Sequence, residues 1–317
     1  MAEDSAWFRT ATQLEPHFVL NDTNWIAPHR VGGRGRNPTL GVGRRRHDVD
    51  RYVPLYEAKM IHQFDHRWAT YDGLDPRDLR DDEKCSPQLE PVPRYWVPAN
   101  EVQERLTGMG WSRRWLLGWR DTTRATDERT LIASIIPAVG SGDKFLLMFP
   151  GAGPELCAAL LASMNSLVCD FVARQKIGGT SFKLYLIKQI PILPPSSYMP
   201  PDLAFIVPRV LELTYTSHSM APFARDLGYQ GQPFVWNENR RSHLRAELDA
   251  WYARAYCLTR DELRYILDPA DVKGPNYPSE TFRVLKKNEL ARFGEYRTAR
   301  LVLAAYDELT QHPIAAE

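Results

Sequence analysis

The chain has 317 residues, which is enough for one large or two ordinary domains with a substantial core. Hydrophobic residues make up 44%, charged residues 25%, and the net charge is +1, so the composition excludes a disordered or polycationic protein. No apolar run approaches the ~20 residues of a membrane span, and the four cysteines form no C-x-x-C pair. We therefore expect a cytoplasmic protein without a membrane segment, in which only local clustering of basic residues would attract a polyanion.

Residues 1–50 form an N-terminal segment whose second half is rich in arginine and glycine. The stretch 30–47 contains six Arg, five Gly and no acidic residue. Such a composition cannot bury a core, so it predicts a flexible arm. Arg44, Arg45 and Arg46 at its end are candidate contacts to phosphates or to a minor groove, and a solvated loop is the alternative.

Residues 51–195 predict an α/β domain. Aromatic and β-branched residues favour strands, whereas clusters of Pro, Gly and charged residues favour loops. In chain order we expect one or two strands in 51–71, a loop in 75–93, a short strand and then a helix in 93–106, two strands around a polar turn in 115–137, and a strand in 144–149.

A basic stretch follows the next predicted helix. Residues 154–176 place apolar side chains at helical spacing and predict a single helix. From Phe171 to Pro201 there is no acidic residue, while Arg174, Lys176, Lys183 and Lys188 are basic. A cationic stretch across a helix end and the turn Gly178-Gly179-Thr180 is typical of a surface that binds a polyanion.

Residues 196–317 predict a mainly α-helical C-terminal domain after a proline-rich hinge at 194–202. Apolar spacing predicts a helix over 240–257, and the capping box of Thr259 with Glu262 predicts the start of another, which ends at Asp268-Pro269. Ser279 is expected to cap a further helix that ends at Gly294, and a last helix follows. The expected fold class is thus a mixed α/β domain followed by a helical one.

Two motifs could carry catalysis. The sequence FPGAGPEL over 149–156 has the F-x-G-x-G spelling of an S-adenosylmethionine loop, but no Asn/Asp-Pro-Pro-aromatic loop accompanies it, so an ordinary turn is favoured. Glu57 and Lys59, with Asp48 and Asp50 upstream, form the E-x-K half of a Mg²⁺-dependent nuclease core. A strand with solvated charges is favoured there, and the nuclease stays as the alternative.

Two histidines could instead hold a metal ion. His62 and His66 flank Asp65, but the segment is β-like and offers no obvious third ligand. We therefore expect neither a metal-ligating nor a catalytic residue in this chain, and we expect His62 to lie on a polar surface or to contact DNA.

Six segments resemble, in their order and spacing, the C-terminal third of type IIG-like adenine-N6 DNA methyltransferases of bacterial restriction–modification and phage-defence systems. They are residues 53–73, 95–102, 120–137, 165–195, 244–269 and 274–309. In that family a methyltransferase core precedes this region and carries the cofactor loop and the Asn-Pro-Pro-Tyr loop, both of which are missing here. The resemblance implies a target-recognition region without its own catalytic site, either a fragment of a longer protein or a stand-alone gene.

The resemblance also implies partners and contact residues. The expected partners are double-stranded DNA, read at its base edges in the major groove, and a methyltransferase core in cis or in trans that binds S-adenosylmethionine and flips the adenine. Gly178, Gly179 and Thr180 would bind phosphate. The other candidate contacts, besides the arm arginines, are Lys59, His62, Arg67, Arg113, Arg114, Arg174, Lys176 and Lys183. A module that docks a protein of a defence complex is a further alternative.

Overall fold

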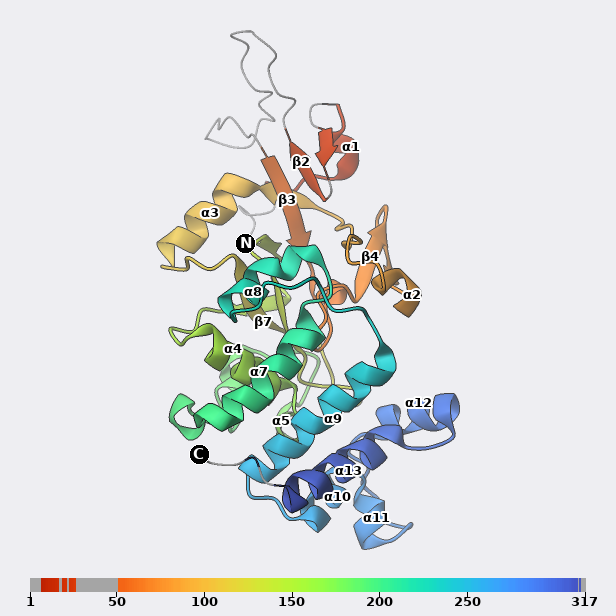
Figure 1. Ribbon diagram of the computed structural model, residues 1–317. Helices are drawn as coiled ribbons and strands as arrows, with labels where there is room; N and C mark the ends of the chain where they lie inside the picture. The colour runs from red at the N-terminus through yellow and green to blue at the C-terminus, as the bar shows by residue number, and fades with distance from the viewer. Residues whose placement is uncertain (1–6, 17–18, 22, 27–50, 313, 315–317) are drawn as a thin grey trace.

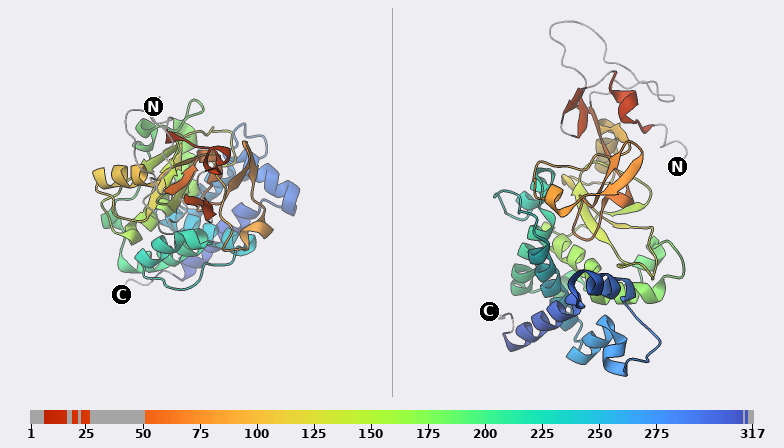
Figure 2. Two further views of the ribbon diagram at one scale, coloured as in Figure 1. Left: turned by 90° about the horizontal axis from the view of Figure 1, so that it is seen from above. Right: turned by 90° about the vertical axis from the view of Figure 1, so that its right-hand side faces the viewer.

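The computed structural model describes residues 7–16, 19–21, 23–26, 51–312 and 314. The molecule is elongated, with strands β1 (Val19–Asn21) and β2 (Asn24–Ile26) at one end and helix α10 (Arg260–Leu267) at the other (Figure 1). The right-hand view of Figure 2 shows the same elongated shape from the side. The arm at 30–47, with Arg44, Arg45 and Arg46, lies outside the described residues and stays a prediction.

The described strands form three sheets. One has the order β1-β2-β3-β6 with β9 parallel to β3, the second has the order β10-β7-β8, and the third is the pair β4-β5. The remaining strands are β3 (Arg51–Tyr56), β4 (Ala69–Asp72), β5 (Asp75–Asp78), β6 (Trp96–Pro98), β7 (Trp115–Arg120), β8 (Ala133–Pro137), β9 (Gly140–Ser141) and β10 (Phe145–Met148).

Helices make up the rest of the regular structure. They are α1 (Ala11–Leu14), α2 (Asp81–Lys84), α3 (Ala99–Gly108), α4 (Pro154–Asn165), α5 (Leu167–Lys176), α6 (Leu184–Ile187), α7 (Pro200–Thr214), α8 (Ala221–Asp226), α9 (Glu238–Ala255), α11 (Pro269–Lys273), α12 (Arg283–Phe293) and α13 (Arg297–Gln311), with short 3₁₀ helices η2 (Ala58–Met60), η3 (Pro195–Ser197) and η4 (His218–Met220). The mixed α/β composition is confirmed, and the strands predicted near 96, 115–137 and 145 are present.

Strand β7 positions the start of the basic stretch. Its Gly118 lies opposite Leu147 of β10 and Ser134 of β8. A Cβ atom at Gly118 would lie 2.5 Å from the carbonyl oxygen of Leu146, so glycine is what lets β10 approach. β7 ends at Arg120, and the next amide, that of Asp121, donates to the carbonyl of Lys144 over 2.8 Å.

The single helix predicted over 154–176 is wrong, because the chain bends by 57° at Ser166. The Ser166 hydroxyl accepts a hydrogen bond from the amide of Cys169 over 3.2 Å, which starts a new helix. The Asn165 side chain bonds both the amide and the carbonyl of Ala133 in β8. The bend therefore turns α5 away from α4, toward the end of the β7–β8 sheet.

The main hydrophobic core crosses residue 195, the expected domain boundary. It joins Trp115 of β7 and Leu161 of α4 with Val210 of α7 and Leu248 of α9. A second core lies between α5, α9, α10, α12 and α13 and contains Phe282 and Val302. The two regions of the chain thus pack as continuous layers, and α9 runs beside α13 in Figure 1.

The C-terminal helix boundaries lie near those predicted but do not all coincide with them. Helix α9 spans Glu238–Ala255 where 240–257 was predicted, and α7 begins at Pro200, inside the predicted hinge at 194–202. Thr259 and Glu262 form the expected capping box, and Gly294 ends α12 with a left-handed φ of 74°. Ser279 was expected to begin that helix, but α12 starts at Arg283, after the buried ring of Phe282. The ring lies beneath the guanidinium of Arg174, 4.6 Å from its centroid, so tertiary packing sets this start.

In the described part of the chain, no single helix has the length and apolar character needed to cross a membrane. The bent pair of α4 and α5 meets that test by length and composition alone.

Candidate functional site

The glycine turn after α5 is exposed and is held by buried residues on both sides. Ile177 and Phe182 are buried, whereas Gly178, Gly179 and Thr180 between them are exposed. The amide of Phe182 donates to the carbonyl of Asp121 over 2.7 Å. A Cβ atom at either glycine would meet nothing within 4 Å, so packing does not require glycine at these positions.

Lysines surround this turn. Lys176 at the end of α5 is exposed, and Lys183 and Lys144 are each about half exposed. The ammonium groups of Lys183 and Lys144 lie 2.7 Å and 3.6 Å from the same carboxylate oxygen of the buried Asp121. The hydrogen bond to Asp121 raises the pKa of Lys183, so this lysine keeps its charge.

We call the surface made by Lys144, Lys176, Gly178, Gly179, Thr180 and Lys183 the turn surface. Three segments build it: the end of β7, the start of β10 and the turn after α5. The amide of Thr123 joins the first to the third by donating to the carbonyl of Thr180 over 3.2 Å. Lys144 and Lys183 share the buried carboxylate of Asp121, and Lys144 also lies 3.4 Å from the exposed carboxylate of Asp143. With Lys176, the surface therefore carries three ammonium groups against two carboxylates, an excess of one positive charge that favours an anion.

Arg174 is not available on this surface, contrary to expectation. It is 8% exposed, and its two terminal nitrogens donate to four backbone carbonyls, three of them in the β7–β8 loop. Its Nε lies 3.5 Å from the carboxylate of Asp170. Arg174 therefore holds the loop onto α5, because buried carbonyl groups need donors.

Arg67 is likewise a structural residue and not a DNA contact. Its side chain is completely buried, and its terminal nitrogens donate to the carbonyls of Lys84, Ser86, Leu89 and Thr216 over 2.8–2.9 Å. A strand continuing through this segment would place Arg67 on the same face as Lys59, because alternate strand residues share a face. The strand ends at Tyr56, so this alternation does not reach residue 67.

Lys59 and His62 lie apart from the turn surface. Lys59 is exposed in η2, whereas His62 stacks on Trp68 with 4.4 Å between the ring centroids. Burial, together with the positive charge of Arg120, lowers the pKa of His62 to about 3, so the imidazole is neutral at pH 7. His62 therefore adds no positive charge for a phosphate.

Of the other two arginines predicted to contact DNA, Arg113 is held by contacts within the protein and Arg114 is exposed to solvent. Arg113 donates to the carbonyl of Ala152 and to Cys157 Sγ, and it lies 5.0 Å from the ring centroids of both Trp111 and Trp115. Arg114 is exposed. Arg113 therefore fixes the turn before α4, which explains its position without a ligand.

The E-x-K pair does not form a metal site with the described residues. A carboxylate oxygen of Glu57 lies 2.6 Å from Arg94, and Lys59 points outward from η2. His66 is completely buried and bonds Ser217 over 2.9 Å. No group of three or more His, Cys, Asp or Glu in the described ranges could hold a metal ion, while Asp48 and Asp50 lie outside those ranges.

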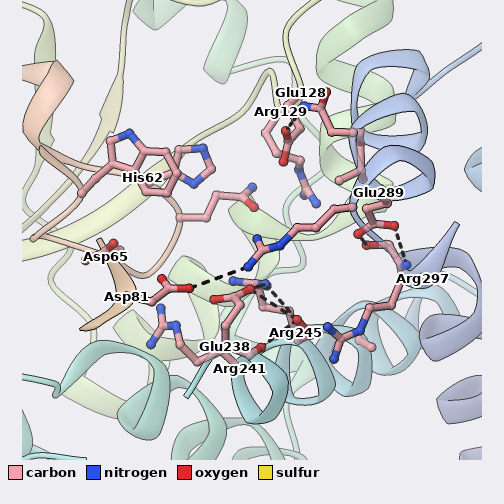
Figure 3. Close-up of a pocket in the computed structure, with 18 of the residues that line it drawn as sticks. His62, Asp65, Asp81, Glu128, Arg129, Glu238, Arg241, Arg245, Glu289 and Arg297 are labelled. Atoms are coloured by element: carbon pink, nitrogen blue, oxygen red, sulfur yellow. Dashed lines mark hydrogen bonds and ion pairs between the residues drawn. The ribbon is translucent and has the colours of Figure 1, made fainter. Parts of the chain in front are cut away.

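A pocket of about 530 Å³ is the feature that the sequence did not predict. It lies between the β4–β5–α2 region, the β7–β8 loop, α9 and the helices α12 and α13, and we call it the junction pocket. Figure 3 shows His62 and Asp65 on one side of it, Arg129 on another, and Arg241 and Arg245 rising from α9. Seven Lys or Arg and seven Asp or Glu side chains line it.

Helix α9 supplies the floor of the junction pocket. Arg241, Arg245 and Asp249 follow one another at intervals of four residues, so they lie on one helix face. This stripe runs beside the apolar one that includes Leu244 and Leu248. Three charged residues at helical spacing are therefore the only sequence signal of the pocket, and solvated helix faces produce the same pattern.

No protein-family model matches this chain, and neither does any curated protein or solved structure. The family resemblance seen in the sequence therefore stays a prediction.

Proposed function

We propose that this chain is the sequence-reading DNA-binding region of a bacterial restriction–modification or phage-defence adenine methyltransferase. The observation that supports this function best is the turn surface, where uncovered glycines and exposed lysines lie at the end of a sheet. Backbone amides and a hydroxyl at such a turn suit phosphate oxygens, and lysines beside them release counterions when they neutralise phosphates.

The proposal assigns different tasks to the two parts of the chain. Residues 51–195 form the α/β target-recognition domain, which carries the turn surface, and residues 196–317 form a helical domain that supports it. Catalysis and S-adenosylmethionine belong to a methyltransferase core in cis or in trans, and the assembly acts in the bacterial cytoplasm. Arg114 and Lys59 remain exposed candidates for secondary phosphate contacts.

The test is binding of the purified chain to random duplex DNA across a salt series. The wild-type affinity should fall steeply with salt, since each neutralised phosphate contributes a slope of about −0.9 on a double-logarithmic plot. The double variant Lys176→Gln/Lys183→Gln should weaken binding and reduce the slope by about 2. Glutamine at position 183 keeps a donor for Asp121, so the turn should stay folded.

A matched control distinguishes loss of contacts at the turn surface from a general loss of positive charge. Lys273→Gln/Lys287→Gln removes the same charge from exposed positions in α11 and α12 and should leave the slope unchanged. Equal effects of the two double variants would refute the turn surface as the contact site. Absence of wild-type binding at low salt would refute an autonomous DNA reader and favour the protein-docking module.

A further inference from the structure

The junction pocket contains a buried arginine whose hydrogen-bonding capacity is mostly unused. Arg241 is 3% exposed, and only its Nη1 has a protein acceptor, the carbonyl of Leu213. Its Nε and Nη2 have no hydrogen-bond partner among the described residues. These two nitrogens form one edge of the guanidinium plane, which is the edge that binds a carboxylate or phosphate through two parallel hydrogen bonds.

The acids that act on Arg241 are each paired with another cation. The guanidinium of Arg241 lies 3.7 Å from the ring centroid of Trp236, and the buried ammonium group of Lys84 lies 4.4 Å from the same centroid. The charges of Asp65 and Glu238 both act on Arg241, but Asp65 is bonded to Lys84 over 2.7 Å and Glu238 is bonded to Arg245. Two buried cations thus share one buried carboxylate, and burial of an unpaired charge is costly.

Across the lining, the acids are already engaged. Six of the seven carboxylates have a protein donor: Asp65, Asp81, Glu128, Glu238, Asp249 and Glu289. Two of the arginines, by contrast, have no carboxylate within 4 Å in the described part of the chain: Arg241 and Arg297. By the same 4 Å measure, four of the lining acids have no cation partner among the described residues: Asp78, Glu128, Asp249 and Glu289. The lining therefore has no excess of positive charge, and what it offers an anion is the unused pair of donors on Arg241.

The size and lining of the pocket limit the kind of ligand that it could bind. About 530 Å³ is within the range of small-molecule sites and exceeds what a single inorganic ion needs. Arg241 and Arg245 lie one helical turn apart on α9, which suits successive phosphate groups. Away from these arginines, His62 stacks on Trp68 with 4.4 Å between the ring centroids, and the ammonium group of Lys84 lies 4.8 Å from the Trp68 centroid.

We propose that the junction pocket binds a phosphate-bearing ligand of nucleotide size. Arg241 and Arg245 hold the phosphate groups, Arg297 contacts them from the start of α13, and the base lies toward His62 and Trp68. This site is separate from the turn surface and does not depend on the DNA-binding function proposed above.

The test is calorimetric titration of the full chain with pyrophosphate and with ATP, in low salt and without Mg²⁺. Both ligands should bind the wild type, and Arg245→Gln/Arg297→Gln should weaken each by tenfold or more. Arg241→Gln should abolish binding, but it also alters a buried group, so the double variant decides if Arg241→Gln does not fold. Arg300→Gln is the control, because Arg300 pairs with Glu295 on the exposed face of α13 outside the pocket.

Two outcomes would overturn the proposal: no wild-type binding at millimolar pyrophosphate or ATP, or equal affinities of the double variant and the wild type. A DNA titration distinguishes the source of the phosphate. We expect Arg245→Gln/Arg297→Gln to leave duplex binding unchanged. If this variant weakens duplex binding while pyrophosphate and ATP fail to bind, the free nucleotide is refuted and the phosphates are those of the DNA backbone.

Discussion

The turn surface and the junction pocket use the same types of residue in opposite ways. The lysines of the turn surface lie mainly in one short stretch of sequence, and few acids accompany them. The pocket gathers its cations from five separate parts of the chain and places an equal number of acids among them. A cluster of basic residues in the sequence therefore indicates a surface like the turn surface, but it gives no sign of a pocket like the junction pocket.

Breaking the buried pair beside the pocket should have the largest effect. Burial by itself would raise the pKa of Asp65, but Lys84 and Arg241 lower it to about 2, so the carboxylate is charged at pH 7. Lys84→Ala leaves this charge without its ammonium partner and should reduce the free energy of unfolding by about 3–5 kcal/mol. Urea denaturation at pH 7 measures the change.

The double variant Lys84→Met/Asp65→Asn provides the control for that prediction. It removes both charges while keeping similar volumes, so it should recover much of the stability lost in Lys84→Ala. A loss as large as that of the single variant would mean that packing of Lys84 against Trp68 and Trp236 matters more than the ion pair.

The second prediction contrasts two neighbouring cations of α5. Arg174→Met leaves four carbonyl groups without a donor and should lower stability by about 2–4 kcal/mol. Lys176→Gln, two residues later and exposed, should change stability by no more than about 0.5 kcal/mol. Thermal and urea unfolding of both variants test the contrast, and equal effects would contradict the structural assignment of Arg174.

The third prediction concerns the pH dependence of the pocket floor. Burial raises the pKa of Asp249 from 3.8 to about 6. The folded state therefore binds this proton more tightly than the unfolded state, and the contribution of Asp249 to stability rises as the pH falls from about 7 to about 4, by up to about 3 kcal/mol. Asp249→Asn replaces the carboxylate by a group that carries no charge at either pH. Relative to the wild type, the variant should therefore have a higher free energy of unfolding at pH 7, where Asp249 is charged, than at pH 4, where Asp249 is protonated.

Urea denaturation of both proteins between pH 4 and pH 7 measures this difference. Asp271 gives a control of opposite sign, because its hydrogen bond to Arg264 lowers its pKa. Its contribution is therefore lost as the pH falls, and Asp271→Asn should cost stability at pH 7. A difference between wild type and Asp249→Asn that does not vary with pH would refute the raised pKa.

Local patterns predicted much of the fold. The isoleucines at 132, 135 and 136, the capping box at Thr259 and the glycine at 294 each act within a few residues, so the sequence predicted their elements correctly. The break at Ser166 also had a local signal, since Asn165-Ser166 is a typical helix start, but the apolar periodicity continued through it.

The site was less predictable, because exposure is a tertiary property. Arg174 and Lys176 belong to the same basic stretch, yet one is buried by the β7–β8 loop and by Phe282 while the other is exposed. Arg241 lies on a helix with many charged residues, and contacts with distant parts of the chain, such as the carbonyl of Leu213 and the charge of Asp65, make its position unusual. Contacts between residues this far apart in the chain leave no periodic pattern in the sequence.

The smallest expected effect is at the outer wall of the junction pocket. Gly294 ends α12 with φ 74°, and it joins this helix to the start of α13, where Arg297 lies. Alanine adopts this conformation at a cost of about 1 kcal/mol, because its Cβ atom crowds the backbone, while open space surrounds the position. Gly294→Ala should therefore destabilise the junction of α12 and α13 without unfolding the chain. Amide hydrogen exchange should rise in α12 and stay unchanged in β7, whereas a uniform rise would mean that the wall and the sheet unfold as one unit.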